Sequence, residues 1–169
     1  MLELKMVKKG EEELALNFID EARVYLKEQG IEQWQNGYPS MDTIKEDVEF
    51  LRGYFIVKDN KEIGYICVDI DGKAGYQEID GEWKASGRYS VINRMTISKK
   101  SRDKGLADAA FKLAEEISTK RNVNIIRIAT DISNKKMQHI IGKLGYYHCG
   151  NIVSADGGIR LAYEKVIEI

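Results

Sequence analysis

Residues 97–107 read ISKKSRDKGLA, a short polar loop that joins a β-rich run to a helical pattern. A strand over residues 89–97 leads into this loop, and apolar residues at helical spacing follow over residues 105–120. Such a junction directs free backbone N–H groups and the positive end of the helix dipole at one point. The cations of the loop are Lys99, Lys100, Arg102 and Lys104. The pattern indicates a phosphate or pyrophosphate site, with a solvated basic turn as the alternative.

The segments on either side of this junction predict a mixed sheet covered by helices. Apolar runs indicate strands at residues 2–7, 54–57, 63–68, 89–97, 123–129, 146–153 and 160–166. Helical spacing of apolar residues indicates helices at residues 11–29, 41–51, 105–120 and 137–144. The early strands read as an antiparallel meander, and a strand–helix–strand unit follows. We therefore expect an α/β (α+β) fold with a mixed, mostly antiparallel central sheet of about seven strands and about four flanking helices.

The composition fits a single domain over residues 1–169, since 43% hydrophobic residues are enough for one core. A net charge of -1 argues against a global basic field, so we expect no nucleic-acid or membrane partner. Cys67 and Cys149 are too few for a disulfide framework and indicate a reducing compartment. The first residues lack a secretory pattern, and no apolar stretch approaches the roughly 20 residues of a membrane span. These features predict a cytoplasmic protein.

Two motifs resemble those of a known family. The string Arg102-Asp103-Lys104-Gly105-Leu106-Ala107 resembles the R-x-x-G-x-G/A signature of the GNAT superfamily of N-acetyltransferases, which holds the pyrophosphate of coenzyme A. Asn134, followed by Lys143, Gly145 and Tyr146, resembles the next motif of the family, a helix that ends in a K-x-G-aromatic turn. The resemblance covers nearly the whole chain and is most specific over residues 91–150.

The resemblance implies that acetyl-CoA binds between the strands at residues 89–97 and 123–129, which would lie parallel and splay apart at one end. Pantetheine would fill the gap like an added strand, because the unpaired backbone groups need partners. The backbone near Met95 and Ile97 would hold pantetheine, and Asn134 would lie on the opposite wall. The implied cofactor-binding residues are Met95, Thr96, Ile97, Arg102, Asp103, Lys104, Gly105, Leu106, Ala107 and Asn134.

Acetyl transfer to an amine calls for a base and an acid. An amine with a pKa of about 10.4 is neutral in roughly one molecule per 2,500 at pH 7, so a base must remove a proton. Glu78 and Glu82 belong to a run of carboxylates that forms either an acidic mouth containing the base or a hydrated hairpin. Tyr147 and Cys149 share one face of a strand and are the candidates for the acid. Ile141 stands where many family members carry the tyrosine with that role.

The acceptor is expected beside the aromatic turn between the first two helices, as in the family. Trp34 and Tyr38 are candidate substrate-binding residues, with core packing as the alternative for Trp34. Arg94 is the third candidate: it either neutralises an acidic group of the acceptor or pairs with a neighbouring carboxylate, and the second reading is favoured.

These features together predict an acetyl-CoA-dependent N-acetyltransferase that uses no metal. The acceptor would be a primary amine of a small molecule or peptide, which attacks the thioester directly in a ternary complex. The alternatives are a coenzyme A-binding module without turnover and a nucleic-acid binder with a basic loop, which the overall charge disfavours. The sequence leaves the choice between a monomer and a homodimer open.

Overall fold

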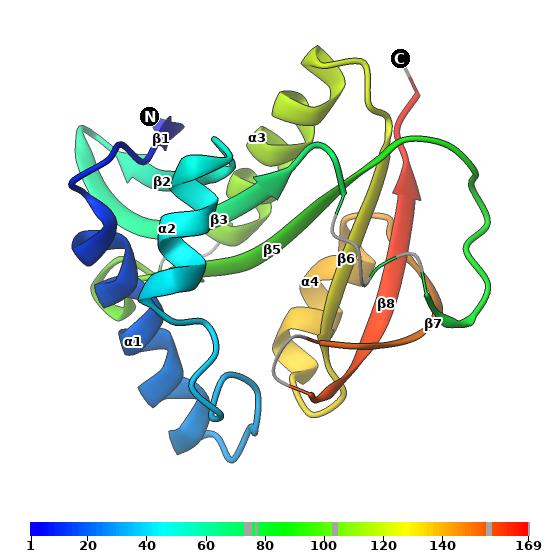
Figure 1. Cartoon of the computed structure of the whole chain (residues 1–169), viewed down its shortest axis with the longest axis horizontal. Coiled ribbons are helices and arrows are strands. Elements are labelled where there is room, and N and C mark those ends of the chain that lie inside the picture. Colours follow the sequence, from blue (N-terminus) through cyan, green and yellow to red (C-terminus); the bar gives the residue numbers. More distant parts are fainter. Residues whose placement is uncertain (73–75, 77, 103–104, 155–156, 169) are drawn as a thin grey trace.

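Figure 1 shows a computed structural model of the chain, which describes residues 1–72, 76, 78–102, 105–154 and 157–168. One sheet crosses the molecule in the order β1-β2-β3-β5-β6-β8-β7-β4. Its strands are β1 (Leu2–Met6), β2 (Gly53–Lys58), β3 (Lys61–Asp69), β4 (Asp80–Gly81), β5 (Tyr89–Ile97), β6 (Ile125–Asp131), β7 (Tyr147–Val153) and β8 (Ile159–Val166). The helices are α1 (Glu12–Glu28), α2 (Met41–Glu49), α3 (Leu106–Lys120) and α4 (Lys135–Lys143), with the short 3-10 helix η2 (Lys99–Ser101). Among the described residues, no helix is long and apolar enough to cross a membrane.

The sheet is mixed and mostly antiparallel, which confirms the expected fold class. β5 and β6 pair in parallel, and the other neighbouring pairs of the described sheet are antiparallel. The sheet has eight strands because β4, with only two residues, pairs with β7. A strand of two residues has no alternating pattern, so sequence periodicity does not reveal it.

Helices α1 and α2 cover one face of the sheet, and α3 and α4 cover the other (Figure 1). Phe55 and Val57 of β2 belong to the same core cluster as Ile19 of α1. The intervening Ile56 belongs to the second cluster, with Phe111 of α3. Successive strand residues point to opposite faces, so both faces of the central strands are buried. This double burial explains why those strands are continuous apolar runs in the sequence.

β5 and β6 separate along most of their length. The pairing covers Tyr89–Val91 of β5 and Ile125–Arg127 of β6, whereas β5 continues to Ile97 and β6 to Asp131. Figure 1 shows the two strands close together at one end and apart at the other. The expectation of a splayed parallel pair is therefore confirmed.

A β-bulge interrupts β5 within the separated part. Where β3 has the single residue Ile66 between two paired positions, β5 has two residues, Arg94 and Met95. Arg94 has a φ of 52°, a left-handed conformation that is uncommon for a residue with a side chain. Bulges increase the local twist of a strand and redirect its side chains. The bulge therefore sets the direction in which Arg94 leaves the sheet.

Candidate active site

A cavity of about 370 Å³, here called the cofactor cavity, lies in the gap between β5 and β6. Its walls come from β5, β6, α1, α3 and α4. Of the residues predicted to bind the cofactor, seven line it: Met95, Thr96, Ile97, Arg102, Gly105, Ala107 and Asn134. Leu106 instead packs against the hydrophobic core, and the predicted Asp103 and Lys104 lie outside the described residues.

The edge of β5 turns backbone groups of Ile97 toward this cavity. The Ser98 N–H donates to the carbonyl of Ile63 on β3 at 2.6 Å, so Ser98 faces the neighbouring strand. Backbone groups alternate in direction along a strand, which turns the N–H and C=O of Ile97 toward the gap. Arg102 Nε donates to that Ile97 carbonyl at 3.0 Å, as this orientation requires. An extended chain with amide groups can therefore pair with this edge.

The first turn of α3 supplies free donors at one end of the cavity. The first helical hydrogen bond of α3 runs from the Ala109 N–H to the carbonyl of Gly105. The N–H groups of residues 106–108 precede it and have no acceptor within the helix. Gly105 has a φ of 89°, and a Cβ placed on it would meet no atom within 4 Å. The helix N-terminus is thus open toward a ligand, and the dipole there favours an anion.

The side chains of the cofactor cavity are mostly cationic. Its described lining contains four cations, Arg94, Arg102, Lys136 and Lys143, and one carboxylate, Asp108. Lys143 pairs with Asp108 at 2.8 Å. Arg102 stacks on the ring of Tyr25 at 4.2 Å, which orients its guanidinium. A local positive field therefore exists on a chain with a net charge of -1, as a phosphate site requires.

Asn134 joins the two walls at the β6 side of the gap. Its Oδ1 caps α4 by accepting the Met137 N–H at 3.2 Å. Its Nδ2 donates to Gln33 Oε1, also at 3.2 Å, and Gln33 belongs to the segment between α1 and α2. Asn134 therefore fixes the position of that segment relative to α4.

A second cavity of about 260 Å³, here called the acceptor cavity, adjoins the first. All three residues predicted to bind the acceptor, Trp34, Tyr38 and Arg94, line it. The two cavities share five lining residues: Gln33, Trp34, Asn93, Arg94 and Ala129. Sequence reasoning missed Asn93, which lies on the shared wall. Its Oδ1 is buried and has no hydrogen-bond partner among the residues that the structure describes.

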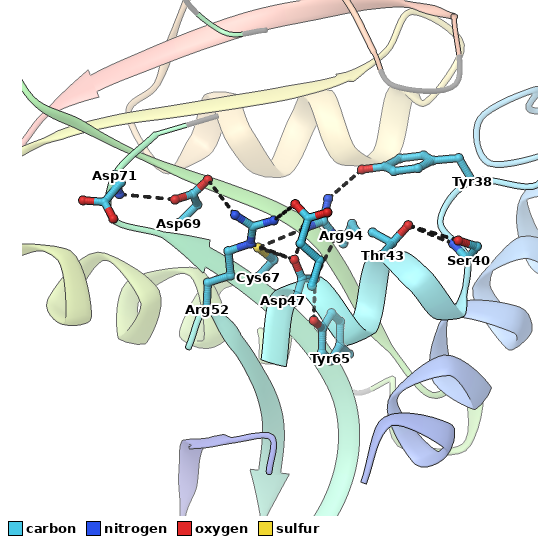
Figure 2. Close-up of polar contacts among 11 residues, drawn as sticks. Tyr38, Ser40, Thr43, Asp47, Arg52, Tyr65, Cys67, Asp69, Asp71 and Arg94 are labelled. Carbon is cyan, nitrogen blue, oxygen red and sulfur yellow. Dashed lines mark hydrogen bonds and ion pairs between the residues drawn. The ribbon is translucent and has the colours of Figure 1, made fainter. Parts of the chain in front are cut away.

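Figure 2 shows the buried network that holds Arg94. Asp47 of α2 is fully buried. Its carboxylate accepts hydrogen bonds from Arg94 Nε at 3.0 Å, from Arg52 Nε at 2.9 Å and from Tyr65 Oη at 2.6 Å. Arg94 Nη1 also donates to Tyr38 Oη at 2.6 Å. Arg94 thus pairs with a neighbouring carboxylate, which is the reading that the sequence favoured.

Electrostatics keep the Asp47 carboxylate ionised. Burial acts to raise its pKa, but the charge and hydrogen bonds of Arg94, with those of Tyr65 and Arg52, outweigh burial and lower the pKa. The carboxylate therefore anchors the guanidinium of Arg94 at the bulge. Sequence reasoning also missed Asp47. The available signal was its spacing of three residues from Ile44, which places both side chains on the inward face of α2.

The candidates for proton transfer lie outside the lining of both cavities. Glu78 and Glu82 are exposed. Tyr147 Oη donates to Glu164 Oε1 at 2.9 Å, and burial together with this carboxylate raises the pKa of Tyr147 to about 12. Burial and Glu164 also raise the pKa of Cys149, so its thiol stays protonated at neutral pH. The structure thus brings together seven of the ten predicted cofactor residues and the three predicted acceptor residues, but not these four.

The chain resembles known proteins in sequence and in structure. The model of the Acetyltransferase (GNAT) family matches residues 19–146. A GNAT-family acetyltransferase from Streptococcus agalactiae is 30% identical with a TM-score of 0.88, over 99% of this chain and 96% of that one. A putative acetyltransferase from Staphylococcus aureus is 25% identical with a TM-score of 0.70, over 98% and 99% of the two chains.

More distant structures share the fold. An aminoglycoside acetyltransferase solved in complex with coenzyme A is 15% identical with a TM-score of 0.70, over 98% of this chain and 95% of that one. No curated protein matches the sequence at a significant level.

Proposed function

The chain belongs to the GNAT family of acetyltransferases, and we propose that it is an N-acetyltransferase that acts on a primary amine. Acetyl-CoA is the acetyl donor of this family. In the proposed reaction the amine attacks the thioester directly while both substrates are bound. The observation that carries the proposal is the wall shared by the two cavities, since five residues line both. An amine in the acceptor cavity can therefore reach a thioester in the gap without a covalent enzyme intermediate.

The residues of the gap fit coenzyme A. The backbone of Met95 and Ile97 would pair with the amides of pantetheine, as an added strand pairs with a sheet edge. The free N–H groups at residues 106–108 and the guanidinium of Arg102 would hold the diphosphate. The N–H groups at residues 106–108 have no acceptor within α3, so binding of the diphosphate would supply one.

The chemistry of the transfer needs charge stabilisation and proton removal. The amine nitrogen bonds to the carbonyl carbon, the C–S bond breaks, and the sulfur leaves as a thiolate that takes up a proton. Backbone N–H groups at the free edge of β5 would polarise the carbonyl oxygen. The shared wall, as far as the structure describes it, contains no carboxylate, histidine or cysteine. We therefore propose that the proton released by the amine nitrogen passes through water to the departing thiolate, and we give Glu78, Glu82, Tyr147 and Cys149 no catalytic role.

The second candidate function is a coenzyme A-binding module without turnover. Ile141 favours it, because this residue is fully buried in the core and carries no hydroxyl group at the place where many family members have an acid. The geometry favours the transferase, because a module that only binds coenzyme A has no need for an acceptor cavity that opens onto the thioester.

One experiment separates the two functions. The protein is incubated with acetyl-CoA and a broad panel of amines, and the release of free thiol is followed. Calorimetric titration with coenzyme A runs in parallel. Thiol release that depends on an amine supports the transferase. Binding of coenzyme A with no amine-dependent release supports the module, and absence of binding contradicts both.

A further inference from the structure

The charges that line the acceptor cavity have one sign. Its described titratable side chains are two arginines and two tyrosines, Arg94, Arg160, Tyr38 and Tyr76, and the described lining contains no carboxylate. A cavity built for a polycation would carry acidic groups, since like charges at close range are unfavourable in a buried site. The exposed Glu78 and Glu82, which could have formed an acidic mouth, do not line this cavity.

Arg160 is the cation that lines the acceptor cavity alone. It is 4% exposed and pairs with Asp131 Oδ2 at 3.5 Å. Asp131 Oδ1 is engaged elsewhere, because it accepts both the N–H and the hydroxyl of Ser133. A guanidinium is planar, stays charged at every accessible pH and matches the two oxygens of a carboxylate. Arg160 lines the acceptor cavity but not the cofactor cavity, so it lies away from the reacting end.

Asn93 marks the reacting end of the acceptor cavity, because it lines both cavities. Its Oδ1 is buried and has no hydrogen-bond partner among the described residues, so this atom is closed to a ligand. An amine at the shared wall lies beside the gap that would hold the thioester, and its nitrogen lone pair is available for attack.

The size and remaining walls of the cavity limit the acceptor. Trp34, Tyr76 and Ile152 supply aromatic and apolar surface to the cavity. The volume of about 260 Å³ is below the 300–1,000 Å³ that is typical of pockets for drug-sized ligands. The cavity therefore suits a small acceptor that carries one amine and one anionic group.

We propose that the acceptor is an α-amino acid or a short peptide, bound with its amine at the shared wall and its carboxylate at Arg160. This assignment rests on the proposed function, because it names the amine that the acetyl group would reach. It also makes Arg160 the residue that decides acceptor specificity.

The test compares each acceptor with its own amide. The wild-type protein is assayed for thiol release from acetyl-CoA with a panel of L-amino acids and dipeptides and with the same compounds as C-terminal carboxamides. Amidation removes the carboxylate but keeps the amine and the side chain. It also leaves more of the amine neutral, because a nearby negative charge no longer favours the ammonium form. We expect the kcat/KM of at least one acid to be tenfold or more above that of its amide, although the amide has more of its amine in the neutral form.

Two variants connect this preference to Arg160. Arg160→Gln should reduce the ratio of the two kcat/KM values, acid to amide, from tenfold or more to below threefold. The reduction should come from a higher KM for the acid. Arg160→Lys keeps the charge and should retain part of the ratio. Circular dichroism and titration with coenzyme A show whether each variant is folded. If Arg160→Gln does not fold, the lysine variant and the wild-type panel decide.

The possible results distinguish a wrong acceptor from a wrong function. Amides acetylated as well as acids, or better, would overturn the assignment of the acceptor while the transferase function stands. Binding of coenzyme A without acetylation of any acid in the panel would also overturn it, and the broad amine panel then judges the function separately. Failure to bind coenzyme A at all would instead contradict the proposed function. An acid preference that survives unchanged in Arg160→Gln would remove Arg160 from the site.

Discussion

Replacement of Arg102 by alanine should weaken the binding of coenzyme A much more than the binding of pantetheine. Arg102 lines the cofactor cavity, and its Nε is already bonded to the Ile97 carbonyl at 3.0 Å. The stack on Tyr25 at 4.2 Å orients the rest of the guanidinium. Only coenzyme A carries phosphates that this group can bind, whereas pantetheine tests the strand edge alone.

The size of the effect follows from the geometry. A hydrogen bond to a charged group contributes about 1.5–3 kcal/mol, and the partial exposure of Arg102 places the expected loss near the lower end. Since about 1.4 kcal/mol corresponds to a factor of ten, the dissociation constant of coenzyme A should rise about 10- to 30-fold. The constant for pantetheine should change by less than about threefold, because the Ile97 contact is a single neutral hydrogen bond.

Isothermal titration with both ligands measures the two constants. Arg88→Ala is the matched control, because Arg88 is exposed and pairs with Asp71 on the surface, outside both cavities. Arg102→Lys keeps the charge but loses the planar guanidinium, so its loss of affinity for coenzyme A should lie between those of Arg88→Ala and Arg102→Ala. Equal losses for coenzyme A and pantetheine in Arg102→Ala would contradict a phosphate-binding role. Unchanged affinity for coenzyme A would remove Arg102 from the site.

Three further predictions concern other parts of the structure. Gly105→Val should lower stability by about 1–2 kcal/mol, because of its positive φ, and weaken coenzyme A binding more than tenfold; melting curves and titration measure the two effects. Asp47→Asn should lower the free energy of unfolding by about 3–5 kcal/mol in urea, because it leaves Arg94 buried without its counter-charge. The lowered pKa of Asp47 adds a pH test: its stabilisation is complete above the unfolded pKa of 3.8 and is lost as the pH falls through the folded value, so the wild type and Asp47→Asn should converge in acid. Tyr147→Phe and Cys149→Ser should keep acetyl transfer, and inactivation of either folded variant would restore that residue as a catalytic candidate.

The strand end and the helix start around residues 97–107 could be predicted because they depend on backbone geometry. A strand, a polar loop with Gly105 and a helix start define where free N–H groups point, whatever the neighbouring side chains are. The splayed strands were expected from the resemblance to the family, and the structure shows them.

Parts of the acceptor cavity could not be predicted, because they depend on contacts between residues that are far apart in the sequence. The bulge at Arg94 appears only in the register of β5 against β3, and the partner Asp47 comes from a helix 47 positions earlier. Asn93 looks like an ordinary strand residue in the sequence, and only the structure shows that it lines both cavities. The acidic run with Glu78 and Glu82 was prominent in the sequence, yet charge composition gives no information about the direction in which a loop faces.

The structure of the complex with coenzyme A tests the central claim most directly. Pantetheine should lie between β5 and β6 with its amides bonded to the backbone of Met95 and Ile97. The diphosphate should lie within about 2.7–3.2 Å of the N–H groups at residues 106–108. Coenzyme A bound at any other surface, or β5 and β6 paired along their full length in the complex, would contradict the claim.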